Sequence, residues 1–244
     1  MKPFLLIATR AEDDTADAEY EQFLRFGNLD ESELVRLRLE QRPMPDINLD
    51  DFSGIIVGGS PFTGSDPDDQ KSDTQKRVEQ EISTLLDEVV VRDFPFLGAC
   101  YGVGTLLSHQ GAVIDSTYSE PVGGVMISLT EDGRQDPLLA EVPDTFGAFV
   151  GHKEACTVFP AHAVLLASSP TCPVQMFRLK NNLYGTQFHP ELDAPGIATR
   201  IRTYKDFGYF EPDQADSLIA ETSQWDVSDA NRVVAAFTAR YATR

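Results

Sequence analysis

Short apolar runs rich in β-branched residues alternate along the chain with longer segments in which apolar residues recur every three or four positions. The short runs predict strands, and those without any polar side chain, such as Gly54–Val57, are typical of parallel strands buried on both faces. The strands expected from this pattern are Phe4–Ala8, Leu34–Leu39, Gly54–Val57, Phe96–Ala99, Val125–Leu129, Val164–Ala167, Val174–Leu179 and Tyr184–Phe188.

The longer amphipathic segments predict helices. One helix is expected to open at Asp66-Pro67, where a capping residue precedes proline at the first helical position. Its apolar stripe comprises Val78, Ile82, Leu85, Leu86 and Val89. A second helix is expected after Ser228, with its inward face formed by Val233, Val234, Phe237 and Tyr241.

This alternation of strands and helices predicts an α/β fold with a doubly wound, largely parallel sheet. The stretch from Thr117 to about Leu183 carries strand patterns with few helix signals, which indicates an antiparallel extension of that sheet. No linker or internal repeat divides the sequence. We therefore expect one domain over residues 1–244, with the C-terminal helices (about 196–244) packed on it.

The charge of the chain narrows the range of its partners. Asp and Glu number 39 against 20 Lys and Arg, which gives a formal net charge of −19. Such a surface repels phosphate backbones, so neither nucleic acid nor an anionic membrane is an expected partner. The acidic runs Glu12-Asp13-Asp14 and Asp66–Asp69 are expected to be solvated surface rather than part of a catalytic site.

No segment has the pattern of a signal peptide or a membrane span. The longest apolar stretch, Val89–Leu107, is interrupted by Arg92, Asp93 and Pro95. The three cysteines are too few for a disulfide framework, and no pair has zinc-type spacing. A reduced, cytoplasmic chain without a metal or cofactor is expected.

One cysteine lies in a pattern that carries chemistry. The strand Phe96–Ala99 runs into Gly98-Ala99-Cys100-Tyr101-Gly102, and a helix is expected to follow. This is the cysteine form of the nucleophile elbow, in which glycines allow two chain segments to pass closely. The helix N-terminus favours the thiolate, with an expected pKa of roughly 3.5–7.5. The alternative is a structural, buried thiol, the interpretation that we give to Cys156 and Cys172.

A thiol nucleophile needs a base, and one of the four histidines is suited to this role. His189 directly follows a buried-strand pattern, and Pro190 biases it towards an extended backbone. The period of two then points His189 and Glu191 the same way, so that the carboxylate can orient the imidazole. The alternative is a surface turn with an incidental His and Glu.

The motifs Gly98-x-Cys100-x-Gly102 and Phe188-His189-Pro190-Glu191 resemble those of the class I (triad-type) glutamine amidotransferases, and among these stand-alone chains similar to the amidotransferase domain of GMP synthase. The resemblance implies a flavodoxin-like fold. It implies that Cys100 attacks the side-chain amide of glutamine, that ammonia leaves, and that water hydrolyses the γ-glutamyl thioester. His189 would then be the base and acid, and Glu191 its orienter.

The same resemblance assigns further residues and contains two departures. The backbone N–H groups of Gly59 and Tyr101 would hold the oxyanion, while the Gly151-His152 segment would help to hold the amino-acid end of glutamine. Gly104 stands where the family usually carries Gln, and Glu154 stands where it carries Asp. We expect Gly104 to enlarge the cavity and to remove one contact to glutamine.

Three functions remain open. The first is a glutaminase that releases ammonia for an unknown acceptor, for which the resemblance allows a separate synthetase protein. The second is a stand-alone γ-glutamyl peptidase, and the third is a non-catalytic binding module. Cysteine proteases with a related elbow are disfavoured because they typically place His directly after the nucleophile, where this chain has Tyr101.

The aromatic segment Tyr204–Phe210 and Trp225 could cover the site or a partner surface, although plain packing is favoured. The acceptor and the oligomeric state stay undetermined.

Overall fold

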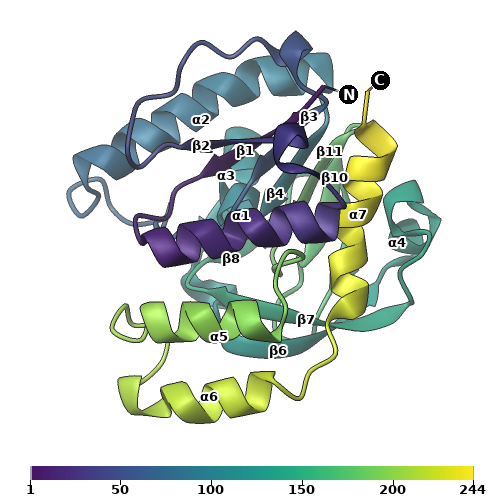
Figure 1. The fold of residues 1–244 in the computed structure, drawn as a ribbon. Helices are drawn as coiled ribbons and strands as arrows, with labels where there is room; N and C mark the ends of the chain where they lie inside the picture. The colour runs from purple at the N-terminus through teal and green to yellow at the C-terminus, as the bar shows by residue number, and fades with distance from the viewer. Residues whose placement is uncertain (1, 244) are drawn as a thin grey trace.

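A nine-stranded mixed sheet forms the centre of the molecule in the computed structural model, which describes residues 2–243 (Figure 1). Its strands run in the order β2-β1-β3-β4-β11-β10-β9-β6-β7. Their bounds are β1 Phe4–Ala8, β2 Leu34–Arg38, β3 Gly54–Val57, β4 Phe96–Ala99, β6 Glu120–Leu129, β7 Thr145–His152, β9 Ala163–Ser168, β10 Met176–Leu179 and β11 Leu183–Thr186. A separate antiparallel pair consists of β5 (Val113–Asp115) and β8 (Ala155–Val158).

The sheet has a parallel and an antiparallel half. Strands β2, β1, β3, β4 and β11 pair in parallel, whereas β11, β10, β9, β6 and β7 pair antiparallel. The α/β class and the antiparallel extension predicted from the sequence are thereby confirmed. Because β3, β4 and β11 are adjacent and parallel, their carboxyl ends meet at one edge of the sheet, and the candidate chemistry lies there.

Three strands were not predicted. Strands β5 and β8 are short, and β7 contains Gly147 and Gly151, which weaken a strand pattern in a sequence. In the fold, a Cβ atom on Gly147 would lie 2.6 Å from the carbonyl oxygen of Asp226. Gly147 therefore allows the segment at Asp226 to pack closely against the strand, a contact that the local sequence does not predict.

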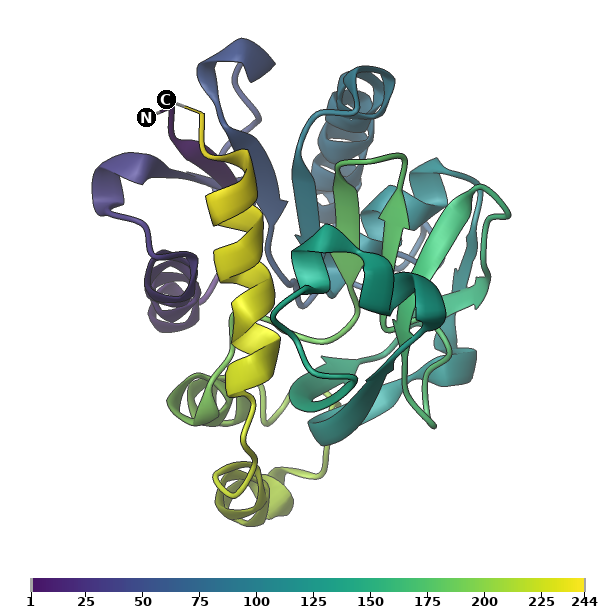
Figure 2. The ribbon, with the colours of Figure 1, turned by 90° about the vertical axis from the view of Figure 1, so that its right-hand side faces the viewer.

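Helices cover both faces of the sheet. Their bounds are α1 Asp13–Gly27, α2 Asp73–Arg92, α3 Tyr101–His109, α4 Glu131–Gln135, α5 Ala194–Thr203, α6 Ala215–Thr222 and α7 Ser228–Tyr241. Figure 2 shows α1 and α7 on one side of the sheet and α2 on the other. Alternate residues of β1 divide accordingly: Phe4 and Leu6 join the core under α1 and α7, whereas Leu5 and Ile7 join the core under α2 and α3.

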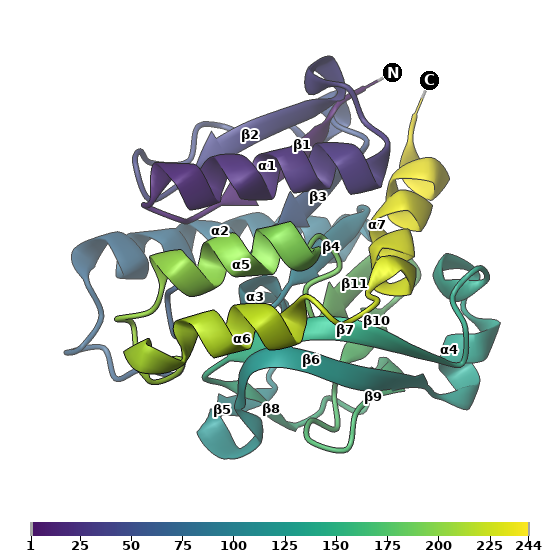
Figure 3. The same ribbon diagram turned by 60° about the horizontal axis from the view of Figure 1, so that its bottom comes forward.

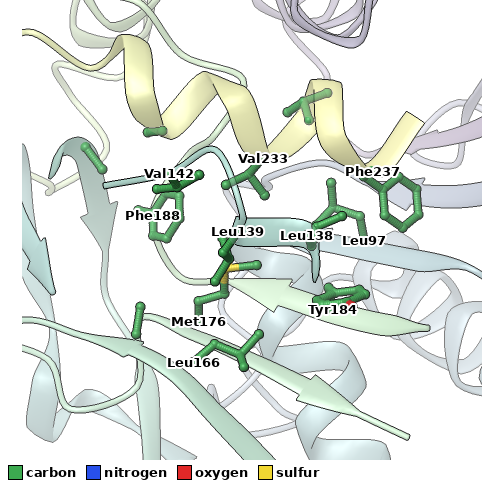
Figure 4. Close-up of a cluster of buried hydrophobic side chains, with 14 of the residues drawn as sticks. Leu97, Leu138, Leu139, Val142, Leu166, Met176, Tyr184, Phe188, Val233 and Phe237 are labelled. Atoms are coloured by element: carbon green, nitrogen blue, oxygen red, sulfur yellow. The ribbon is translucent and has the colours of Figure 1, made fainter. Parts of the chain in front are cut away.

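The helix predicted after Ser228 is confirmed as α7, and it closes one of these cores. Val233 and Phe237 of α7 lie over Tyr184 of β11 and Met176 of β10, and all four side chains are fully buried (Figure 4). The C-terminal helices lie on the rest of the fold: α7 contacts α1 and β7, α5 contacts α1, and α6 contacts β6 (Figure 3).

The predicted start of α2 was wrong. The helix begins at Asp73, and its cap is Ser72, whose hydroxyl accepts a hydrogen bond from the Gln75 backbone N–H (3.1 Å). Asp66-Pro67 instead forms a turn, in which the Gln70 N–H donates to the Pro67 carbonyl. The apolar stripe predicted for this helix is buried as expected.

Helix α1 was not predicted, because the acidic run that opens it was interpreted as solvated surface. Asp13 and Asp14 lie in its first turn, where negative charge favours helix formation. Asp13 accepts a hydrogen bond from Arg38 (2.6 Å), and Glu12 accepts one from the Tyr204 hydroxyl (3.0 Å). Asp13 and Asp14 are nevertheless exposed, as expected of a solvated surface, and so are Asp66–Asp69.

Two further features of the described residues complete the fold. None of their helices is both long and apolar enough to cross a bilayer. At the amino edge of the sheet the two ends of the described chain lie side by side, where the Lys2 N–H donates to the Thr243 carbonyl (3.1 Å) and the Ser53 and Thr243 hydroxyls lie 2.9 Å apart (Figure 1).

Candidate active site

Cys100 lies on a sharp turn between β4 and α3. Its backbone has φ of +52° and ψ of −93°, a strained conformation for a residue with a side chain. A Cβ atom on Gly98 would lie 2.6 Å from the Gly102 backbone, and one on Gly102 would lie 3.1 Å from the Val57 carbonyl oxygen. Both glycines are therefore needed for the close passage of chain that the elbow requires.

His189 and Glu191 follow β11, the strand beside β4. The His189 backbone N–H donates to the Phe149 carbonyl (2.9 Å), and its ring Nδ1 lies 2.8 Å from Glu191 Oε1. Both side chains are buried. Cys100 and His189 line one cavity of about 40 Å³. Within residues 2–243 no hydrogen bond joins the thiol to the imidazole, and such contacts often tighten only when a substrate binds.

Burial dominates the electrostatics of this pair. It raises the pKa of the Cys100 thiol to about 12, although the positive charges of Arg10 and Arg200 oppose the shift. Burial likewise lowers the pKa of His189 to about 4, with Glu191 opposing and Arg200 adding to the effect. The low thiol pKa expected from the helix N-terminus is therefore wrong for this closed site. At neutral pH the thiol and the imidazole are both uncharged.

A buried cluster of charged side chains surrounds the histidine. Glu19 Oε1 accepts hydrogen bonds from Arg10 (2.9 Å) and Arg200 (3.0 Å), and Glu191 Oε1 accepts one from Arg200 (2.8 Å). Despite burial, His189 and Arg200 hold the pKa of Glu191 well below its usual value. Sequence reasoning missed three of these residues. Arg10 lies two residues after the end of β1, at the carboxyl ends of the strands where the site lies, and this position could have pointed to it. Glu19 and Arg200 lie within helices, where no comparable signal exists.

The turn after β3 brings Gly59 to the site. A Cβ atom on Gly59 would lie 2.8 Å from His189 Cε1, so the turn passes directly beside the imidazole. Among residues 2–243, neither the Gly59 N–H nor the Tyr101 N–H donates to a backbone or side-chain acceptor. Tyr101 directly follows Cys100 and Gly59 lies beside His189, so two free backbone donors are available near the site for an oxyanion. The assignment of these two groups stays a prediction.

Gly104 lines the cavity beside Cys100 and also a larger one of about 520 Å³. The Glu154 carboxylate lies in contact with Gly104, since a Cβ atom on Gly104 would be 3.5 Å from Glu154 Oε1. The same carboxylate accepts hydrogen bonds from the backbone N–H groups of Gly64 (2.9 Å) and Ser65 (2.7 Å). The adjoining cavity, which Cys100, Gly104 and Glu154 line together, holds only about 20 Å³. The two departures from the family pattern therefore lie in contact, and both residues also line the cavity of about 520 Å³.

His152 supports the other wall of the same cavity, which Gly151 also lines. It is buried, with Nδ1 2.9 Å from the Glu154 carbonyl oxygen and Nε2 2.8 Å from Glu120 Oε2. Glu120 also accepts a hydrogen bond from Gln175 (2.7 Å). These bonds fix the backbone that carries Gly151 and Glu154, and His152 itself also lines the cavity. Cys172 lies close enough to Glu120 and His152 for the three to form a group of metal-ligand type, but the hydrogen bonds account for the buried carboxylate.

The aromatic segment after α5 both packs and covers the site. Tyr204 stacks edge-on against Phe207, with ring centroids 5.1 Å apart, as the packing interpretation expects. Tyr204, Tyr209 and Phe210 also line the cavity of Cys100 and His189. Lys153 fastens this segment, since its ammonium donates to the Phe207 carbonyl (2.8 Å) and lies 4.6 Å from the centre of the Tyr209 ring. The covering role was the less favoured prediction. Trp225 packs against Gly124 and Gly147 instead.

Comparisons with known proteins agree with this arrangement. The family model "Glutamine amidotransferase class-I" matches residues 25–196. The chain is 27% identical over 178 residues to one of the subunits of the glutamine-hydrolyzing GMP synthase of Thermoplasma volcanium, covering 72% of this chain and 78% of that protein. It is 27% identical over 145 residues to the longer glutamine-hydrolyzing GMP synthase of Hamiltonella defensa, covering 57% of this chain and only 25% of that protein.

A solved structure extends the likeness to the whole fold. The crystal structure of a glutamine amidotransferase from Thermotoga maritima superposes with a TM-score of 0.77 at 21% identity, covering 99% of this chain and 98% of the other. The sheet, its antiparallel extension and the C-terminal helices thus recur together in a protein of similar length.

Proposed function

Because the chain belongs to the class I glutamine amidotransferase family, we propose that it hydrolyses the side-chain amide of glutamine through a γ-glutamyl thioester on Cys100. One observation carries the proposal: a cysteine on a strained elbow shares a cavity with a histidine that is paired to a buried carboxylate. Nucleophile, base and orienter are the three roles that acyl transfer by a thiol requires.

The proposed reaction uses each of these groups in turn. His189 Nε2 takes the proton of the Cys100 thiol as sulfur attacks the amide carbon, and Glu191 stabilises the resulting imidazolium. The backbone N–H groups of Gly59 and Tyr101 hold the oxyanion. His189 then returns the proton to the amide nitrogen, and ammonia leaves. Water, deprotonated by His189, attacks the thioester and releases glutamate and the free thiol.

The size of the cavity beside His189 favours a small leaving group. The leaving nitrogen receives its proton from His189, so the leaving group lies on the histidine side of the sulfur. The walls there include Leu192, Ile197 and Phe210. A water molecule needs roughly 10–15 Å³ by this measure, so the cavity of about 40 Å³ accommodates ammonia as it stands. The glutamyl moiety needs more space than the neighbouring cavity of about 20 Å³, so glutamine requires the site to open on one side of the sulfur, whereas a γ-glutamyl peptide requires it on both.

We infer that the ammonia passes to a separate protein. The chain matches most of a protein named as one of the subunits of GMP synthase, but only a quarter of a longer GMP synthase. The part of the longer protein that lies beyond the match has no counterpart in that alignment. The likeness supports a synthetase as the acceptor.

A panel of γ-glutamyl compounds tests the proposal. Glutamine and γ-glutamyl methylamide should be hydrolysed, γ-glutamyl p-nitroanilide should be hydrolysed poorly, and Cys100→Ser should abolish all three reactions. Glutamate and the released amine are both measured. Preference for the anilide would favour the peptidase, whereas no turnover of any compound by the wild-type protein would favour a binding module.

A further inference from the structure

Two groups of opposite hydrogen-bonding character reach the same nitrogen of His189. Arg200 Nη1 and Glu191 Oε1 each lie 2.8 Å from Nδ1. Arg200 comes from α5, and its side chain is only 9% exposed. Its other terminal nitrogen, Nη2, donates to Glu191 Oε1 (2.8 Å) and to Glu19 Oε1 (3.0 Å). The guanidinium is therefore held firmly beside the imidazole.

The two contacts demand different tautomers of the ring. A guanidinium only donates hydrogen bonds, whereas a carboxylate only accepts them. If Nδ1 accepts from Arg200, the proton of the neutral imidazole is on Nε2, which then cannot accept the thiol proton of Cys100. If Nδ1 carries the proton and donates to Glu191, Nε2 is free to act as the base. One ring cannot satisfy both partners at once.

The remaining hydrogen bonds favour the first arrangement. Glu191 Oε1 accepts a hydrogen bond from Arg200 Nη2 and keeps it when the histidine does not donate. Among residues 2–243, Arg200 Nη1 has His189 Nδ1 as its one acceptor. A buried charged donor without a partner is costly, so Nη1 favours a bare Nδ1 as its acceptor.

We propose that Arg200 is a positioning residue that holds His189 in the idle tautomer, with the proton on Nε2, until its Nη1 leaves Nδ1. The proposal rests on the proposed roles of Cys100 and His189. In the free protein the thiol of Cys100 is then poorly reactive. The base is prepared when the hydrogen bond from Arg200 Nη1 to His189 Nδ1 breaks.

Arg10 provides a matched control within the same cluster. It is buried, carries the same charge and donates to the same oxygen of Glu19 (2.9 Å), but it makes no hydrogen bond to His189 among the described residues. An effect of charge or of cluster stability would be shared by Arg10→Lys and Arg200→Lys. An effect on the tautomer belongs to Arg200→Lys, because the shorter lysine keeps the charge but lacks the second nitrogen that reaches Nδ1.

The direct test observes the ring nitrogens of His189. Long-range ¹H–¹⁵N spectra of protein labelled at histidine distinguish a protonated from a bare ring nitrogen, and His189→Gln assigns the signals. Wild type and Arg10→Lys should show the proton on Nε2. Arg200→Lys should show it on Nδ1. A wild-type protein with the proton on Nδ1, or an unchanged spectrum in Arg200→Lys, would overturn the proposal.

Alkylation of Cys100 by iodoacetamide at pH 7.5 gives a second readout. If the idle tautomer is roughly nine-tenths of the free protein, its removal in Arg200→Lys should speed alkylation about tenfold, with little change in Arg10→Lys. A slower reaction in Arg200→Lys would contradict the proposal.

Both readouts are taken without glutamine, so the proposed hydrolysis can fail independently of them. Should Arg200→Lys fold poorly, the pair Glu19→Gln with Arg200→Met removes one charge of each sign and should give the same change of tautomer. An unchanged tautomer in that pair would equally overturn the proposal.

Discussion

Cys100 has a strained backbone conformation, and the close packing of Gly98 against Gly102 maintains it. We predict that Gly98→Ala displaces the elbow, because the new Cβ would lie 2.6 Å from the Gly102 backbone, where nothing can move aside cheaply. A displacement of about 1 Å can lower turnover roughly a hundredfold. Steady-state hydrolysis of glutamine measures the loss. Gly123→Ala is the control, since a Cβ there meets nothing within 4 Å; equal losses in both variants would contradict this account.

His189 links the stability of the protein to pH. Its pKa of about 4 in the folded state lies below the ordinary value of 6.5, so the unfolded chain binds a proton first as the pH falls. The free energy of unfolding should therefore decrease from about pH 6.5 down to pH 4, by roughly 3 kcal/mol at 1.36 kcal/mol per pKa unit.

Urea unfolding of wild type and His189→Gln at several pH values tests this link. As the pH falls from 6.5 to 4, the unfolding free energy of the wild type should decrease relative to that of His189→Gln, because the glutamine does not titrate. Parallel curves for the two proteins would show that His189 is not held uncharged by burial.

The residues that sequence reasoning identified are those whose signals are local. Cys100 is marked by two glycines within two positions, and Glu191 by its distance of two from His189. Arg10, Glu19 and Arg200 come together from three separate elements, and their roles depend on packing that no short pattern records. The expected pKa of Cys100 failed for the same reason, since burial is a property of the assembled fold.

At the scale of elements, the loop after β3 is fastened by Glu154 against the start of α3. We predict that Gly104→Gln raises KM for glutamine, because the new side chain would begin 3.5 Å from the Glu154 carboxylate and crowd it beside the cavity that Cys100 lines. Shortening the acid in the double variant Gly104→Gln with Glu154→Asp should restore KM towards the wild-type value. Steady-state kinetics of the two single variants and the double variant measure the coupling. Additive effects would show that the two positions act independently.

Helix α7 also holds the segment that carries the candidate base. The Asn231 side chain donates to the carbonyl oxygens of Pro190 (2.8 Å) and Leu192 (2.9 Å), on either side of Glu191. Asn231→Ala leaves these buried acceptors without a partner, so we predict a loss of about 1–3 kcal/mol of stability together with a lower kcat. Urea unfolding and kinetics check both. Stability lost with kcat unchanged would confine Asn231 to the fold alone.

At the scale of the whole molecule, the order of the strands determines where the chemistry lies. Gly59, Cys100 and His189 follow β3, β4 and β11, which are neighbours in the sheet but far apart in the sequence. The sequence predicted the buried strands β1, β3 and β4 with their observed bounds, because a continuous apolar run is unambiguous. Helix α1 and strand β7 were missed, because the acidic start of α1 and the glycines of β7 do not resemble a helix or a strand in the sequence alone. Their contacts with neighbouring elements stabilise them in the fold.

Because Lys2 and Thr243 are adjacent, the chain can be circularly permuted. These residues meet at the amino edge of the sheet, opposite the carboxyl edge where the thiol lies. A short linker could therefore join them, and the chain could be reopened at the exposed Pro45-Asp46. Such a circular permutant should keep its active site, and affinity tags placed beside Lys2 or Thr243 should not obstruct that site.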